Sequence, residues 1–285
     1  MKRIIFVGIA FVMGISSQSN AQTINTVLDG AYVPEASVTK RVVPYPYLRE
    51  ADVMWSKRIW RTIDLKEKLN HPLYYPLEDL NDRSSLFNVL KKALLTDNSI
   101  TAYGLGPTQD DDEFKWPLDY NQVDSILNPV VSQAQEDLLT GEINYVDVDD
   151  PVLTEKVTQY HIKEQWVFDR QRSERYVRII GICPRVESYD PTTGDFRGYK
   201  PLFWLYYPEC RYVFQNNWVF NPHNDAERRS FEEIFQKRRF ASFIHKEENV
   251  YDRPIASYAQ GIDALLEAER VKEELFLLEH DLWHY

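Results

Sequence analysis

Two histidines near the C-terminal end have the spacing of a metal-binding pair. His280 and His284 are four residues apart, so on a helix they share one face and could ligate the same zinc ion. In the zinc-protease motif a glutamate general base follows the first histidine, whereas here that residue is Asp281, one methylene shorter. A third ligand would have to come from upstream, for example Glu279. We favour the alternative, a polar helix end with Trp283 packed inward, and predict no metal here.

Two acidic runs raise the question of calcium. Residues 110–113 read Asp-Asp-Asp-Glu, and residues 147–150 read Asp-Val-Asp-Asp. Neither run has the glycine that an EF-hand loop needs at its sixth position. Since acidic residues are abundant in this chain, we interpret both runs as solvated surface.

Other catalytic patterns are missing from the sequence. It contains no glycine-rich phosphate loop, no G-x-S-x-G and no C-x-x-C. His161, His223 and His245 are far apart along the chain, and we interpret them as surface or capping residues rather than catalytic bases. The sequence therefore predicts no catalytic residue and no cofactor.

The chain has only two cysteines, Cys183 and Cys210, and each lies in an apolar stretch. We expect two buried thiols that pack as small hydrophobic groups. A single disulfide between them is the alternative, and it depends on a Cα geometry that sequence does not give.

The first 21 residues have the pattern of a signal peptide. Lys2 and Arg3 precede an apolar run over residues 4–15, and the small residues Ser19 and Ala21 stand before the predicted cut. The apolar run is too short to cross a bilayer. We predict an exported protein whose leader is removed after residue 21.

The composition is acidic and aromatic. The chain holds 33 Lys and Arg against 44 Asp and Glu, a net charge of −11, and loss of the leader with its two basic residues would give −13. A nucleic acid is therefore not expected as a partner. Seven Trp and eighteen Tyr suit both cores and protein interfaces.

Helical periodicity is found on both sides of the centre. Residues 54–64 place Trp55, Ile59 and Ile63 at helical spacing and predict a first helix. A second helix is predicted from residue 84 to residue 95.

Two cap signals predict helices in the last third of the chain. Ser230 with Glu233 forms a capping box, and Gly261 precedes a charged amphipathic stretch. We therefore expect one helix after each of these signals.

The centre of the chain has the two-residue period of strands. We expect strands at 160–169 and 176–182, a turn at 190–195, and a third strand over 202–207 that continues through 211–214. Residues 98–116 are expected to form a short strand and a solvated loop. An antiparallel meander of about three or more strands between helices makes an α+β fold.

The domain organisation follows from the same pass along the chain. Residues 22–47 contain three prolines and no sustained period, which predicts an extended proline-rich arm that docks on a partner. Residues 48–285 are then expected to form a single α+β domain.

Short strings, most of them with aromatic residues, lie along the chain at residues 60–65 with Asn70, then 178–182, 196–199, 203–211, 249–253 and 279–283. These strings make the sequence similar to the gliding-motility protein family GldN, also called PorN. The resemblance implies a periplasmic component of the type IX secretion system. It also implies a ring-forming structural subunit that self-associates, binds an outer-membrane lipoprotein (GldK or PorK) and contacts the periplasmic part of the motor protein GldM or PorM. It implies no catalytic residues.

The alternative class is a periplasmic enzyme or binding protein. It would be a metallohydrolase at His280 and His284, or a glycan-binding protein that uses Trp204, Tyr206 and Tyr207 as a stacking platform. Because aromatic residues in a central sheet more often belong to the core, we favour the structural subunit.

Overall fold

A computed structural model of the chain describes residues 41–80, 83–109, 111–136, 143–190, 193–221, 224 and 227–281. The chain divides into two units, residues 1–38 and 39–285, and the described residues belong to the second. The predicted signal peptide and most of the predicted arm lie outside the described residues. No helix in the described part is both long enough and apolar enough to span a membrane.

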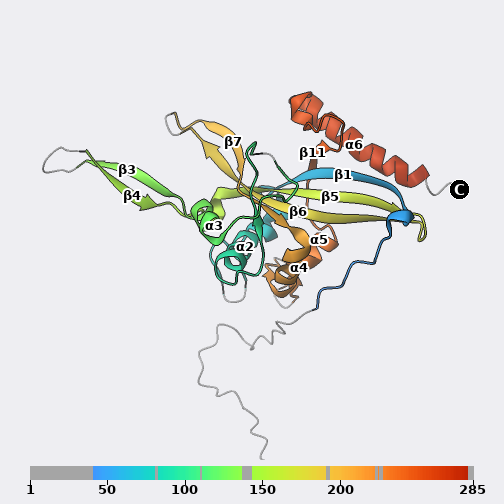
Figure 1. Ribbon diagram of the computed structural model, residues 1–285, viewed down its shortest axis with the longest axis horizontal. Helices are drawn as coiled ribbons and strands as arrows, with labels where there is room; N and C mark the ends of the chain where they lie inside the picture. Colours follow the sequence, from blue (N-terminus) through green and yellow to red (C-terminus); the bar gives the residue numbers. More distant parts are fainter. Residues whose placement is uncertain are drawn as a thin grey trace, which may run out of the picture. The chain divides into compact units, whose positions relative to one another are not determined.

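An antiparallel sheet organises the domain (Figure 1). Its strand order is β11-β1-β5-β6-β8-β2, and β7 pairs with the far end of β6. The strands are β1 (Val53–Asp64), β2 (Ala102–Tyr103), β5 (Val157–Asp169), β6 (Glu174–Tyr189), β7 (Phe196–Pro201), β8 (Trp204–Tyr206) and β11 (Phe243–Glu247).

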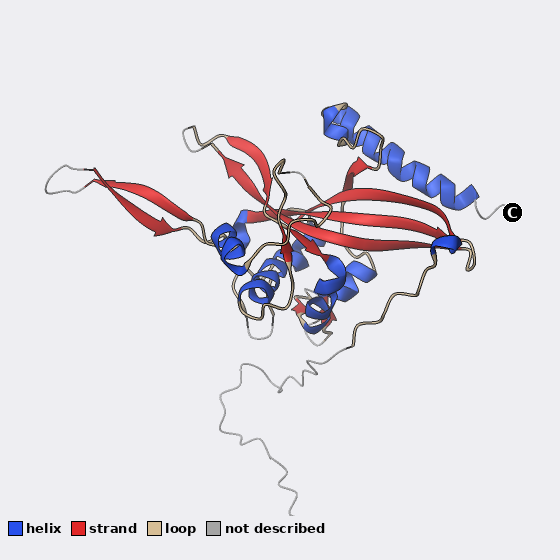
Figure 2. Ribbon diagram, viewed as in Figure 1, coloured by secondary structure: helices blue, strands red, loops and turns tan. Residues whose placement is uncertain are grey.

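The helices precede, interrupt and follow this sheet (Figure 2). They are α1 (His71–Tyr74), α2 (Leu86–Leu95), α3 (Tyr120–Leu127), α4 (Tyr207–Asn216), α5 (Phe231–Gln236) and α6 (Ile262–Asp281). Two small ladders complete the description, the pair β9 (Trp218–Val219) and β10 (Arg229–Ser230) and the hairpin of β3 (Val130–Glu136) and β4 (Ile143–Asp149). The prediction of an α+β fold with a central antiparallel sheet is confirmed.

The helix predicted over residues 54–64 is wrong, because this segment is strand β1. It pairs with β5 over almost its whole length, with Trp60 opposite Lys163 and Arg61 opposite Ile162. From Ile59 to Ile63 both faces of the strand are buried. Because this part of the strand is buried on both faces, its apolar residues do not keep a strict two-residue alternation, and the spacing of Trp55, Ile59 and Ile63 also fits a helix.

The two faces of the sheet are covered differently. On the helix face, Ile63, Tyr160, Ile162 and Ile182 pack with α2, α4 and α5 in the main hydrophobic core. On the loop face, Trp60 and Cys183 pack with Trp204, and the segment 103–117 lies over them. Because successive side chains of a strand point to opposite faces, the loop face also receives His161, which pairs with Cys183 across the ladder.

The predicted third strand is correct only at its start. Strand β8 ends at Tyr206, and the expected continuation through 211–214 is instead helix α4, with a proline in its first turn. Its buried residues Tyr207, Cys210, Arg211 and Phe214 have helical spacing. The high aromatic content of residues 202–214 predicted a strand. The segment from Tyr207 onward is a helix because one side of it is buried in the main core.

Two predicted helix starts are confirmed by their caps. Ser85 caps α2, where its side chain accepts a hydrogen bond from the backbone N–H of Asn88 at 3.2 Å. Ser230 caps α5 in the same way, with the N–H of Glu233 at 3.3 Å. Each serine satisfies a backbone donor that the first turn of a helix leaves without a partner.

Candidate functional site

A small cavity of about 160 Å³ lies on the loop face of the sheet. Its walls include Trp60, Asp112, His161, Cys183 and His245. The strands place these residues together, because Trp60 is on β1, His161 on β5 and Cys183 on β6. The cavity brings imidazole, thiol and carboxylate groups together, which makes it a candidate functional site.

Asp112 holds the loop onto the sheet. It accepts a hydrogen bond from the indole Nε1 of Trp60, and Lys163 Nζ lies 3.1 Å from its Oδ1 and 2.8 Å from its backbone oxygen. Phe114 packs where Gly181 leaves room, since a Cβ at that position would stand 2.6 Å from the ring. The acidic run was predicted to be solvated, and this is wrong for Asp112, whose carboxylate is a structural anchor.

His161 and His245 form a stacked pair, with ring centroids 4.0 Å apart and planes inclined by 22°. Arg185 Nη1 donates to His161 Nε2 at 2.8 Å, and Thr62 Oγ1 lies 2.9 Å from His245 Nδ1. The interpretation of these histidines as scattered surface residues is therefore wrong. Residues 161 and 245 are 84 positions apart, and only the pairing of β11 with β1 and of β1 with β5 brings them together.

The electrostatics keep both imidazoles neutral. Burial lowers the pKa of His161 well below its ordinary value, and His245 and Arg185 add to the effect. Burial also lowers the pKa of His245, to about 3, with further contributions from Arg185 and Lys246. A base with such a pKa accepts a proton poorly at neutral pH, so this pair is a poor candidate for general acid–base catalysis.

Neither cysteine has the character of a nucleophile. Burial raises the pKa of the Cys183 thiol to about 12 and also raises that of Cys210. Both are free and buried, so the alternative of a disulfide is not what the structure has. Cys183 points to the loop face, whereas Cys210 on α4 packs in the main core beneath the helix face.

Metal and glycan sites find little support in the geometry. Within the described residues, no group of three or more His, Cys, Asp or Glu side chains is arranged to hold a metal ion. His280 is exposed on α6, and His284 lies outside the described residues, so the absence of a metal there stays a prediction. Trp204 and Tyr207 are buried in different clusters, so they do not form a stacking platform with Tyr206.

Helix α6 is a second candidate, as an interaction surface. One side of it packs on the sheet through Ala268, Val271 and Leu275, against Ile59 and Trp166. In addition, Arg175 Nη1 donates to the carbonyl oxygen of Leu275 at 3.2 Å.

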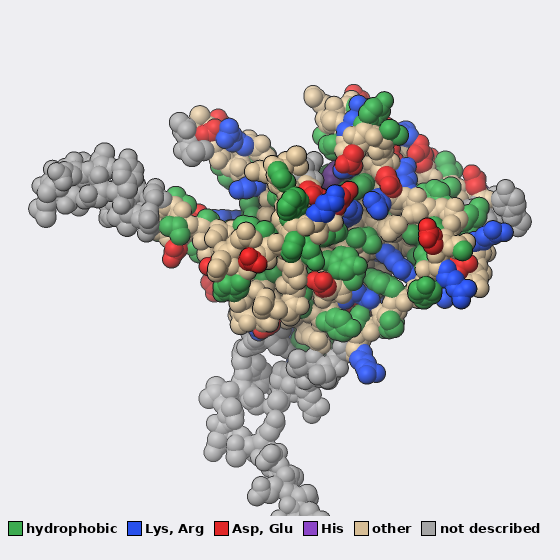
Figure 3. Space-filling model, viewed as in Figure 1, with side chains coloured by type: hydrophobic (Ala, Val, Ile, Leu, Met, Phe, Trp, Pro, Cys, Tyr) green, Lys and Arg blue, Asp and Glu red, His purple; other side chains and the backbone are tan. Residues whose placement is uncertain are grey.

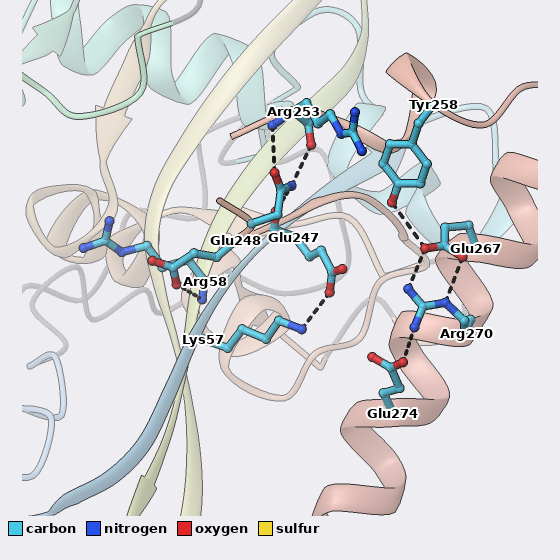
Figure 4. A network of polar contacts seen from close by, with 10 residues as sticks. Lys57, Arg58, Glu247, Glu248, Arg253, Tyr258, Glu267, Arg270 and Glu274 are labelled. Carbon is cyan, nitrogen blue, oxygen red and sulfur yellow. Dashed lines mark hydrogen bonds and ion pairs between the residues drawn. The ribbon is translucent and has the colours of Figure 1, made fainter. Parts of the chain in front are cut away.

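A polar network joins the same helix to the preceding chain (Figure 4). Tyr258 Oη donates to Glu267 Oε1 at 3.3 Å, and Arg270 pairs with Glu267 and Glu274 along the helix. Nearby, Lys57 of β1 pairs with Glu247 of β11 at 2.7 Å. The helix is thus fixed to the sheet by one side only.

The opposite side of α6 is apolar and exposed. Its large side chains are 49–75% exposed, although residues of these types are usually buried. Figure 3 shows apolar side chains together with acidic and basic ones over this helix. The exposed apolar residues are Ile262, Leu265, Leu266, Phe276 and Leu277.

The end of the predicted arm contacts the domain. Tyr45 lies between two guanidinium groups, 3.9 Å from that of Arg211 and 5.3 Å from that of Arg178. The same arginines donate to backbone oxygens on either side, Arg211 to Val43 at 2.7 Å and Arg178 to Pro46 at 2.6 Å. Residues 43–46 are therefore held on the domain by cation–π contacts and charge-assisted hydrogen bonds.

Comparison with known families gives a match over nearly the whole domain. The model of the family "Gliding motility associated protein GldN" matches residues 48–284. The chain belongs to the GldN family. A search of curated proteins found none with a similar sequence.

Residues that carry the resemblance to GldN mostly build the fold. Asn70 is fully buried, and its amide donates to the carbonyl oxygens of Asp64 at 2.7 Å and Ala241 at 2.9 Å. Arg211 pairs with the buried Glu232 at 2.7 Å, and Tyr207 donates to the same carboxylate at 2.8 Å. In this GldN chain these residues serve packing and internal hydrogen bonding.

Proposed function

We propose that this protein is a structural subunit of the periplasmic ring complex of the type IX secretion and gliding-motility machinery. In this proposal it self-associates in the ring, binds an outer-membrane lipoprotein of the GldK or PorK type, and contacts the periplasmic part of a GldM- or PorM-type motor protein. It resides in the periplasm and is held at the outer membrane by the lipoprotein. Membership of the GldN family, over residues 48–284, is the observation that carries the proposal.

The chemistry of the described residues supports an assembly role over an enzymatic one. Asp112, His161 and Lys163 are bound to other protein groups, and Cys183 is buried with a raised pKa. By contrast, α6 exposes large apolar side chains of the kind that protein interfaces bury. We therefore propose no catalytic activity.

Co-expression with the matching lipoprotein tests the proposal. The two proteins should elute together as an assembly many times larger than either chain, since repeated subunits gain stability from closed symmetry. In cells, deletion of the gene should block export of proteins that carry the type IX signal and leave general export to the periplasm unchanged. A monomer beside the lipoprotein, with normal secretion in the deletion strain, would refute the proposal.

Export of the chain is tested separately. The intact mass of protein taken from cell envelopes should show loss of residues 1–21, because Ser19 and Ala21 are the small residues that a signal peptidase requires. A retained leader would contradict a periplasmic location reached by this route.

A further inference from the structure

We propose that the outer face of α6 is a docking surface for a basic amphipathic helix of a partner protein. The outer face is defined by Ile262, Leu265, Leu266, Phe276 and Leu277, with Glu269 and Glu273 between them. This inference rests on the assembly role proposed above and adds to it the surface and the chemistry of the partner.

The spacing of these residues makes one continuous stripe. At 3.6 residues per turn, all seven fall within about 120° of the helix circumference. Ala268, Val271 and Leu275, which pack on the sheet, lie on the opposite side. Helix α6 therefore has two apolar sides, and the sheet uses only one of them.

The size of the apolar surface is sufficient for a partner helix. Ile262 is 75% exposed, Leu265, Leu266 and Phe276 are each 63% exposed, and Leu277 is 49% exposed. With about 150–200 Å² for a large apolar side chain, these fractions leave roughly 470–630 Å² of exposed surface. Patches of this size on a single chain often mark a binding site.

Acidic side chains determine which partner fits. Glu269 and Glu273 lie between the two apolar ends of the stripe. Glu269 pairs with Lys272 at 3.0 Å on the same helix, and in the described part of the chain no ion pair involves Glu273. Over its whole length α6 has seven acidic and two basic residues. A partner helix with lysine or arginine at its centre and apolar residues at both ends would match this pattern.

The same charges argue against two other occupants of the outer face, a second copy of this chain and a membrane surface. If a second copy of α6 packed antiparallel, the Glu269 side chains of one helix would face the Glu273 side chains of the other, and like charges would repel. Helices that lie on membrane surfaces usually have a basic polar face, which α6 lacks. A different protein with a basic helix is the occupant that the charge pattern favours.

A peptide-binding measurement tests the inference on the purified chain. The probes are two synthetic amphipathic peptides of about 20 residues, the length of α6, one with a leucine face flanked by lysines and one with glutamates in place of the lysines. Fluorescence anisotropy should show binding of the lysine peptide, weakened by added salt, and none of the glutamate peptide.

Variants locate the binding on α6. Leu265→Glu with Phe276→Glu should weaken binding of the lysine peptide at least about 30-fold, because two apolar anchors are lost. Glu269→Lys with Glu273→Lys should weaken it about tenfold and allow the glutamate peptide to bind. The matched control is Tyr212→Glu with Val250→Glu, which changes two side chains that are 66% and 97% exposed elsewhere. Unchanged thermal unfolding confirms that the variants are folded.

Several outcomes would overturn the inference. Equal binding of both peptides, or an equal loss in the control, would show that the outer face does not select a basic partner. Self-association that disappears in Leu265→Glu with Phe276→Glu would assign the face to a second copy. Binding to phosphatidylcholine vesicles, lost in the same variant, would assign it to a membrane.

The docking surface and the proposed function can be refuted independently of each other. If gene deletion blocks type IX export but the Leu265→Glu, Phe276→Glu strain secretes normally, the ring role stands and the docking surface is refuted. If the lysine peptide binds as expected but the deletion strain secretes normally, the surface stands and its place in this machinery is refuted.

Discussion

Acid should destabilise this protein through the stacked histidine pair. In the folded chain the pKa of His245 is lowered to about 3, whereas an unfolded histidine has a pKa of about 6.5. Between these values the unfolded chain binds a proton that the folded chain does not, so the free energy of unfolding falls as the pH falls below 6.5. Above that pH the contribution of the pair is fully present.

The expected size of the effect follows from the same pKa values. One such group costs roughly 1.4 kcal/mol per pH unit, so His245 alone accounts for about 2 kcal/mol between pH 6.5 and pH 5. His161 acts in the same direction, because burial lowers its pKa and Arg185 donates to its Nε2, which requires the neutral ring at that atom. The loss caused by both histidines together is a large fraction of the free energy of unfolding of an ordinary domain.

Urea unfolding at pH 7.5, 6 and 5 measures this dependence. The double variant His161→Gln, His245→Gln should show a much smaller loss between pH 6.5 and pH 5 than the unaltered chain, whatever its stability at pH 7.5. The control His280→Gln changes an exposed histidine of α6 and should leave the pH dependence as it was. An identical slope in the double variant and the unaltered chain would refute the reasoning, since carboxylates would then cause the whole effect.

Three further changes test other parts of the structure. Glu164→Gln should cost about 3 kcal/mol in urea unfolding, because it leaves the buried Arg61, whose Nε lies 3.3 Å from the carboxylate, without its counter-charge; a loss below 1 kcal/mol would contradict this. Gly181→Ala should displace Phe114 and make the segment 104–116 more sensitive to protease, with a cost of about 1–3 kcal/mol, and unchanged protection would count against the packing argument. Tyr45→Ala should remove about 1–2 kcal/mol and release residues 43–46 to early proteolysis, whereas Tyr45→Phe should retain most of the contact.

Local signals in the sequence determined the elements that depend on local chemistry. Ser230 caps the helix that it predicted, and Ser85 caps the helix that was predicted to begin at residue 84, because each hydroxyl reaches a backbone N–H only three residues away. The alternation in 160–169 correctly gave a strand, since side chains of a strand point to opposite faces by geometry alone. The expectation that this strand is half-buried is wrong, because β5 lies between β1 and β6 and is buried on both faces. The aromatic strings were also sufficient to indicate the GldN family.

Tertiary structure determined the secondary structure of segments that are buried by distant parts of the chain. Residues 54–64 form a strand because β5 and β11 pair with them, and α4 is a helix because the main core buries one side of a stretch rich in strand-forming residues. The candidate sites depended on tertiary structure still more. His161 and His245 stack because a ladder of strands joins them, and the two sides of α6 differ because the sheet covers only one. Sequence periodicity shows which residues of a helix or strand are apolar. Packing between segments far apart in the chain determines which apolar face is covered and which remains exposed for a partner.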